Sequence, residues 1–162
     1  MPRRKNTPFN VTLLGLLLCI TLFAASPQMH GGFLMSNFAN KLACHFFHAN
    51  LFHWFCNAMA LWIMRPSPKD IAYAFMLAVL AISFTMTPTI GFSAVIYAYI
   101  GMNIIRWKVS LIDWGTFLVA NLITLFIPGV AFGVHLAAFM LGISVYIIHY
   151  QINRILLAVE GK

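Results

Sequence analysis

The feature that most constrains the fold of this chain is a series of long apolar runs separated by short breaks. Hydrophobic residues make up 62% of the 162 residues and charged residues only 8%, whereas a soluble domain has about 45–50% and about 25%. A bilayer core about 30 Å thick needs an apolar helix of about 17 to 25 residues, because a helix rises about 1.5 Å per residue. The sequence therefore predicts helices in a membrane rather than a water-soluble globule.

Six apolar runs meet this requirement or come close to it. The breaks between them carry proline, glycine or basic residues, as in Arg65-Pro66-Ser67-Pro68-Lys69 and Pro128-Gly129. We therefore expect an all-α membrane protein, a six-transmembrane-helix bundle, with residues 1–162 in a single polytopic domain. The expected spans cover residues 9–25, 43–64, 71–86, 91–105, 111–127 and 131–150.

The basic residues predict the orientation, because Lys and Arg in short loops stay on the cytoplasmic side. With both termini in the cytoplasm, Lys41 is the one cation left outside and the other nine of the 10 lie inside. We expect a multi-pass protein of a cell membrane, most simply the bacterial cytoplasmic membrane. The first run also resembles a secretory signal peptide, since it ends at Ala24-Ala25-Ser26. Its removal would leave five spans with the same charge asymmetry.

Polar side chains inside the expected spans each need a partner or a function. In the expected topology, His53 of the second span, Ser93 of the fourth and His135 of the sixth lie near the outer side. Asn57 follows His53 at i+4, on the same helix face. The fourth span covers only about 20 Å from Ser93 to its end and follows a segment with turn signals. Ser93 should therefore begin below the membrane surface, in a pocket that water reaches.

Small residues are expected to bring the fourth and sixth spans together. Ser93 and Gly101 lie on one helix stripe, and His135, Ala138 and Gly142 lie on another. Such stripes let two membrane helices approach closely, which would bring the His135 imidazole to the Ser93 hydroxyl. A hydroxyl beside an imidazole is the arrangement of a nucleophile with its base.

Three segments together resemble motifs of the rhomboid intramembrane serine proteases. Gly91-Phe92-Ser93-Ala94 is similar to their Gly-x-Ser-Gly segment, and Tyr97 and Gly101 also fit that pattern. The segment 48–57 resembles the His-x4-His-x3-Asn signature of their second helix. His135 and Gly142 resemble the pattern His-x2-Gly-x3-Gly of their sixth helix. The resemblance covers residues from about 9 to 150 and implies a bundle of the rhomboid type.

The resemblance implies a role for each residue of these motifs. Ser93 would be the nucleophile and His135 the general base, while His53, Asn57 and the backbone N–H of Ser93 would bind the oxyanion. His48, Tyr97 and Gly91 would support the site.

The sequence departs from the family at several points. Ala94 and Ala138 replace glycines, which adds a methyl group at the helix contact in each case. The segment 26–43 is shorter than the loop usual in the family and lacks its Trp-Arg pair.

The acids exclude several other mechanisms. Asp70, Asp113 and Glu160 are the only acids, and the expected topology places them at the cytoplasmic edge, far from Ser93. A Ser-His-Asp triad, an aspartyl protease and a His-Glu-x-x-His zinc protease are therefore excluded, and a Ser-His dyad remains. A zinc site made of His45, His48 and His53 is an alternative in which Asn57 and Ser93 would have no role.

The function expected from these residues is that of an intramembrane serine endopeptidase, which needs no cofactor and no metal. Its partners would be single-span transmembrane protein substrates and the lipid bilayer. Nucleic acid is not expected, because the cations lie in small clusters between apolar runs. The alternative is a derlin-like pseudoprotease that binds membrane clients without cleavage. A small transporter or channel fits less well, since no ionisable residue lines a path through the middle of the membrane.

Overall fold

The structure, a computed structural model, describes residues 7–23, 38–85, 89–105, 119 and 131–159. These ranges are helical, with loops between the helices and no long strand among them. The helices are α1 (Thr7–Phe23), α2 (Phe38–Ala43), the 3₁₀ helix η2 (Cys44–Phe46), α3 (Leu51–Met64), α4 (Pro68–Thr85), α5 (Ser93–Asn103) and α7 (Phe132–Val159).

Local capping explains where α3 begins and how it is joined to α4. The backbone of Asn50 is extended, and its side-chain oxygen accepts a hydrogen bond from the His53 N–H at 2.8 Å, which is the usual role of an N-cap asparagine. At the start of α4, the Ser67 hydroxyl accepts from the Asp70 N–H at 3.2 Å and the Asp70 carboxylate accepts from the Ser67 N–H at 3.3 Å. This reciprocal pair is a capping box, and it fixes the sharp turn from α3 to α4.

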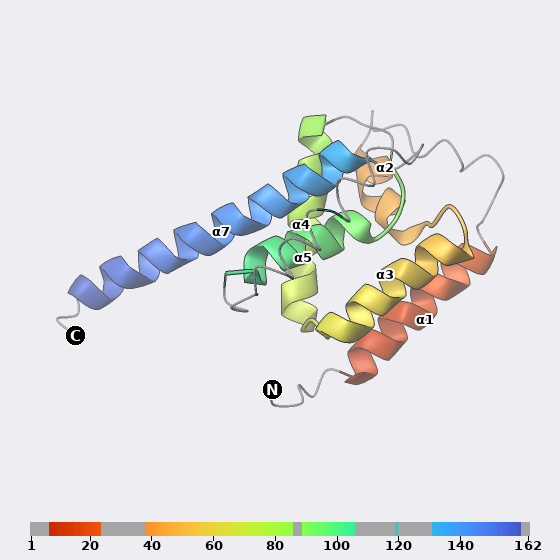
Figure 1. Cartoon of the computed structure of the whole chain (residues 1–162), viewed down its shortest axis with the longest axis horizontal. Coiled ribbons are helices and arrows are strands. Elements are labelled where there is room, and N and C mark those ends of the chain that lie inside the picture. The colour runs from red at the N-terminus through yellow and green to blue at the C-terminus, as the bar shows by residue number, and fades with distance from the viewer. Residues whose placement is uncertain (1–6, 24–37, 86–88, 106–118, 120–130, 160–162) are drawn as a thin grey trace.

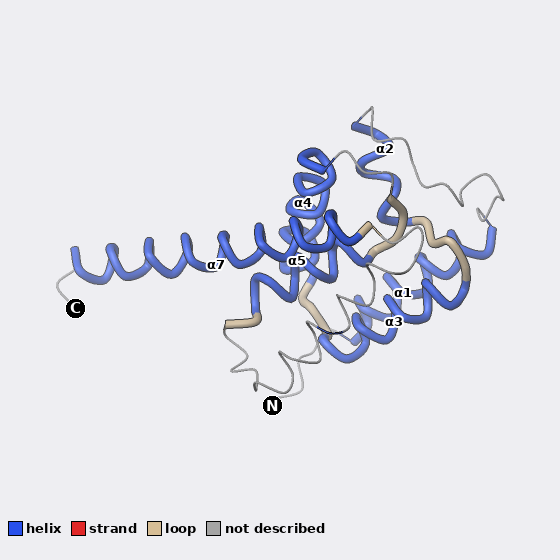
Figure 2. Tube along the Cα trace, turned by 45° about the horizontal axis from the view of Figure 1, so that its top comes forward, coloured by secondary structure: helices blue, strands red, loops and turns tan. Residues whose placement is uncertain are grey.

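The helices form two groups that lie side by side. In one group α1 packs along α3, and in the other α5 packs against α4 and α7 (Figures 1 and 2). The backbone N–H of Gly91 donates to the carbonyl of Cys44 at 2.9 Å. This hydrogen bond joins the segment that leads into α5 to η2, which precedes α3.

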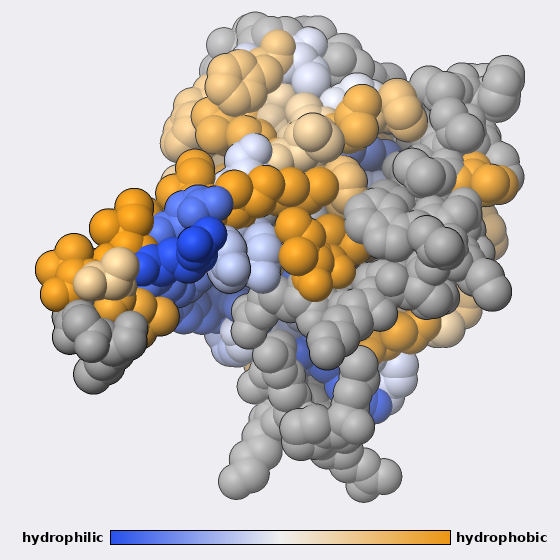
Figure 3. All heavy atoms as spheres, turned by 60° about the vertical axis from the view of Figure 1, so that its left-hand side comes forward, coloured by the Kyte–Doolittle hydropathy of each residue, from blue (hydrophilic) through white to orange (hydrophobic). Residues whose placement is uncertain are grey.

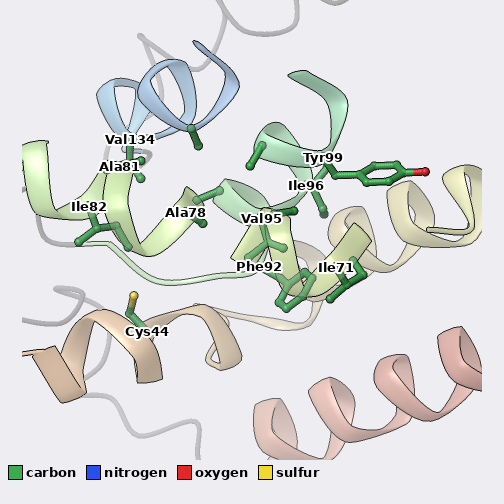
Figure 4. Packing of buried hydrophobic residues seen from close by; sticks show 14 of the residues in the cluster. Cys44, Ile71, Ala78, Ala81, Ile82, Phe92, Val95, Ile96, Tyr99 and Val134 are labelled. Carbon is green, nitrogen blue, oxygen red and sulfur yellow. The ribbon is translucent and has the colours of Figure 1, made fainter. Parts of the chain in front are cut away.

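The closest helix contact lies between α5 and α7. A Cβ atom at Gly101 would collide with the backbone carbonyl of Phe139, and one at Gly142 would collide with the carbonyl of Ala98. Only glycine lets the two backbones approach this closely. The apolar core continues from this contact to α4, with Ala78, Ile82, Val95 and Val134 among its buried side chains (Figure 4).

The expected six-span bundle of the rhomboid type is wrong for this structure. Two helices of the described ranges, α4 and α7, are long and apolar enough to span a membrane. The second expected span, 43–64, contains η2, a break at Phe47–Asn50 and an α3 of 14 residues, about 21 Å long. The fourth contains α5 with 11 residues, about 16 Å, and α1 has 17 residues. Apart from residue 119, the fifth expected span, 111–127, lies outside the described residues.

Two of the expected spans correspond to helices that could cross a membrane by their length and composition. The third expected span, 71–86, falls almost wholly on α4, and the sixth, 131–150, on α7. α7 has 28 residues, so it is about 42 Å long and exceeds the thickness of a bilayer core. Its second half projects from the other helices and exposes mainly apolar side chains, interrupted by a hydrophilic patch (Figures 1 and 3). Such a surface suits lipid better than water.

Candidate active site

Ser93 and His135 lie in contact at the junction of α5 and α7. The Ser93 Oγ and the His135 Nε2 are 2.7 Å apart, a hydrogen bond between residues separated by 42 positions in sequence. Ser93 is the first residue of α5 and is half-buried, and His135 lies in the first turn of α7 with 6% of its surface exposed. An imidazole at this distance can accept the hydroxyl proton while the oxygen attacks an electrophile.

The aromatic ring of Tyr97 packs against the imidazole of His135. Its ring stacks on that of His135 with centroids 4.5 Å apart and an interplanar angle of 10°. It lies one turn after Ser93 on α5, so one helix face carries both the hydroxyl and the ring that orients its partner. The His135 Nδ1 is buried and has no hydrogen-bond partner among the described residues. Within those residues, the stacked Tyr97 ring is the aromatic contact that constrains the orientation of the imidazole.

Gly91 brings His53 and Asn57 of α3 to the segment that leads into α5. Its φ of 113° is one that side-chain-bearing residues rarely adopt. A Cβ atom here would lie 2.5 Å from the His53 Cε1 and 3.6 Å from the Asn57 Nδ2. Asn57 is 5% exposed, and its Nδ2 has no hydrogen-bond partner in the described part of the chain. A buried amide donor near the segment that leads to Ser93 is available to an anionic oxygen.

His48 lies behind His53, in the loop between η2 and α3. The two rings meet edge to face with centroids 5.2 Å apart, and the His48 Nδ1 forms a hydrogen bond of 3.2 Å with the Thr21 hydroxyl of α1. Burial lowers the pKa of His48 to about 4, and the nearby His53 also lowers it, so the ring is neutral near pH 7. His48 therefore links α1 to the helix that carries His53 and Asn57.

The structure thus brings together Ser93, His135 and Tyr97, and it places His53 and Asn57 beside Gly91, with His48 against His53. His45 packs against Phe75, with ring centroids 5.1 Å apart, and its ring also lies near the Gly91 backbone. Within the described ranges, no three His, Cys, Asp or Glu side chains are grouped as metal ligands. His45, His48 and His53 therefore do not form the zinc site considered as an alternative.

Two contributors to the site were not predicted from the sequence. Thr21, the partner of His48, stands out only as a hydroxyl in an otherwise apolar helix, and no spacing relates it to residue 48. Cys44 contributes its backbone carbonyl, which accepts from Gly91. A backbone contact of this kind leaves no signal in the residue types.

Asp70 is the acid nearest in sequence to the residues of the candidate site, but its carboxylate forms a hydrogen bond outside that site. It is the one acid in the described ranges, and it lies in the first turn of α4, where its carboxylate caps the helix at Ser67. Among the described residues, the candidate site is therefore made of a serine, histidines, a tyrosine, an amide and backbone groups. Comparison of the chain with protein-family models, with curated proteins and with solved structures found no match.

Proposed function

We propose that this chain is a serine endopeptidase that cleaves membrane protein substrates, with Ser93 as nucleophile and His135 as general base. The observation that carries the proposal is the hydrogen bond of 2.7 Å between the Ser93 Oγ and the His135 Nε2. The motifs that resemble rhomboid proteases support the proposal through their residue types and spacing. It requires the dyad and a membrane, and it does not include the six-span bundle.

The reaction follows from these groups. His135 takes the proton of Ser93 while the oxygen attacks the scissile carbonyl carbon, and the imidazolium then gives that proton to the leaving amine. Water next attacks the acyl-enzyme, again with His135 as base, and releases the carboxylic acid and the free hydroxyl of Ser93.

The oxyanion that forms in both steps needs hydrogen-bond donors. The backbone N–H of Ser93 opens α5 and so has no helical partner four residues before it. Together with His53 and Asn57 it is the donor set of this proposal. Loss of one such donor typically raises the barrier by about 2.7–4 kcal/mol.

The proposal also places the protein in a membrane, which goes one step beyond the finding of two candidate membrane spans. We place the protein in a bacterial cytoplasmic membrane as a multi-pass protein with both termini inside, because two spans put both termini on the same side and Arg3, Arg4 and Lys5 favour the cytoplasm for the N-terminus. The substrates would be single-span proteins cut near the outer end of their transmembrane helix.

The test compares the purified chain in detergent with Ser93→Ala and His135→Ala, on a fluorescently labelled transmembrane substrate and on a fluorophosphonate probe. Both variants should lose cleavage, and His135→Ala should slow probe labelling of Ser93 by about 10²–10⁴-fold. Ser144→Ala and His149→Ala are matched controls on exposed faces of α7, and each should keep full activity. Equal cleavage by all five proteins would exclude the dyad, and binding without cleavage or labelling would indicate a pseudoprotease.

A further inference from the structure

The turn between α3 and α4 carries two cations that the proposed reaction does not use. The guanidinium carbon of Arg65 lies 5.4 Å from the ring centroid of Trp62, and the Lys69 Nζ lies 5.8 Å from that of Tyr73. Both rings reach the surface, with Trp62 43% and Tyr73 54% exposed. We call these four residues the basic turn. Each of its cations lies within the distance at which an aromatic face attracts a positive charge.

Both cations occupy positions that the backbone does not favour for them. Arg65 has a φ of 47° and ends α3 in the left-handed conformation, where glycine is the usual residue. Its charge suits the negative end of the α3 dipole, but its backbone conformation costs free energy. Lys69 lies in the first turn of α4, at the positive end of a helix dipole, where a cation is unfavourable. Helix stability favours a basic residue at position 65, where the Arg65 Nε also donates to the Trp62 carbonyl at 3.4 Å, but it does not explain why residue 69 is basic.

The basic turn lies at the end of a candidate membrane span. α4 begins at Pro68, between the two cations, and is one of the two helices long and apolar enough to cross a bilayer. α3 ends at the same turn, and the Asn10 amide of α1 donates to the Pro66 carbonyl at 3.5 Å. Three apolar helices thus have an end here (Figure 1). Lysine, arginine, tryptophan and tyrosine at the end of a span lie at the depth of the lipid headgroups.

The charge of the basic turn favours one kind of headgroup. Asp70 supplies one negative charge beside the two cations, and its carboxylate faces the backbone N–H of Ser67, so the turn remains net positive. Phosphatidylglycerol carries an uncompensated negative charge, whereas the choline of phosphatidylcholine is repelled by nearby cations. We propose that the basic turn binds the headgroups of anionic phospholipids at one surface of the membrane. The proposal goes beyond the proteolytic function and does not depend on it.

The experiment measures lipid preference by native mass spectrometry of the full chain in detergent. Phosphatidylglycerol and phosphatidylcholine with identical acyl chains are added in equal amounts, and the ratio of bound lipids is recorded. The test variant combines Arg65→Gly with Lys69→Gln, because glycine adopts the left-handed conformation without strain. Each cation near an anionic surface raises binding about fivefold. The wild-type chain should therefore prefer phosphatidylglycerol, and the ratio should fall by more than about tenfold in the variant.

Two controls distinguish the basic turn from general charge effects. Arg65→Lys with Lys69→Arg keeps both charges and should keep the preference, and Arg154→Gln removes an exposed cation far along α7 and should leave the ratio within about twofold. In the wild-type chain, raising the salt concentration from about 0.05 to 0.5 M should weaken the preference through screening. A wild-type chain without preference, a preference that survives high salt, or an equal loss in Arg154→Gln would overturn the proposal. Helix content by circular dichroism checks the fold of each variant and is independent of proteolysis.

Discussion

Replacing Gly142 by alanine tests whether the contact between α5 and α7 sets the geometry of Ser93 and His135. The new Cβ atom would lie 2.8 Å from the Met102 N and 3.0 Å from the Gly101 Cα, and still closer to the Ala98 carbonyl oxygen. Ordinary contacts begin at 3.4 Å, so α7 must move away from α5 by at least about 0.6 Å, because packed backbone cannot be compressed. A shift of this size along the Ser93–His135 direction would lengthen their 2.7 Å hydrogen bond to about 3.3 Å, beyond the normal range for a hydroxyl donor.

The substitution is expected to lower both stability and activity. Overpacking costs about 1–3 kcal/mol, but alanine regains almost 1 kcal/mol of helix propensity over glycine, so the free energy of unfolding should fall by no more than about 2 kcal/mol. Misplacing a catalytic group by about 1 Å can cost about 10²-fold in rate, and we expect fluorophosphonate labelling of Ser93 to slow by about 10- to 100-fold.

The assay follows probe labelling over time and thermal unfolding in the same detergent. Gly133→Ala is the matched control, because it lies on the same helix and a Cβ atom there has no neighbour within 4 Å among the described residues. It should label within about twofold of the wild-type chain, since no contact changes. Labelling of Gly142→Ala at the wild-type rate would refute the argument that this glycine contact holds the serine and the histidine together.

Two further substitutions probe the groups around the dyad. Gly91→Ala should slow probe labelling and lower the free energy of unfolding by about 1–2 kcal/mol or more. The φ of 113° strains any residue with a side chain, and the Cβ atom would lie 2.7 Å from the His53 Nε2. Unchanged labelling kinetics and an unchanged unfolding temperature would contradict the contact between Gly91 and His53. Tyr97→Leu should slow labelling about 2- to 10-fold, because an aromatic contact of this kind is worth about 0.5–1.5 kcal/mol, while Tyr73→Leu, an exposed ring on α4, should leave labelling unchanged.

The long helices were predictable from the sequence, and the short ones were not. α4 and α7 are long and mainly apolar, so composition and length alone locate them, although α7 continues to Val159, past the expected end at residue 150. The prediction of a continuous second span was wrong because the average hydrophobicity of residues 43–64 does not reveal a local break in the helix. Asn50 caps α3 through the His53 N–H, and this local hydrogen bond competes with a continuous helix. α5 is short for a related reason, since the segment before Ser93 turns at Gly91 and bonds to Cys44 rather than to its own helix.

Part of the candidate site was likewise predictable from the sequence, and part of it was not. Helix periodicity places Tyr97 one turn from Ser93 and Asn57 one turn from His53, and small residues on α5 and α7 predict the close approach that the glycine contacts display. The relation of α1 to His48 depends on tertiary packing between segments 27 residues apart, and no local pattern encodes it. The roles of the nucleophile, the base and the oxyanion donors stay predictions for the assays above.

The separation of 42 residues between Ser93 and His135 gives the two groups different times of appearance during translation. The ribosome delivers the serine first, and the nascent polypeptide carries it without the histidine until residue 135, in the first turn of α7, has been made. In the proposed mechanism an unpaired hydroxyl is a weak nucleophile. The emerging chain would therefore be protected from premature self-digestion, and truncation anywhere before residue 135 would leave an inert serine in the membrane.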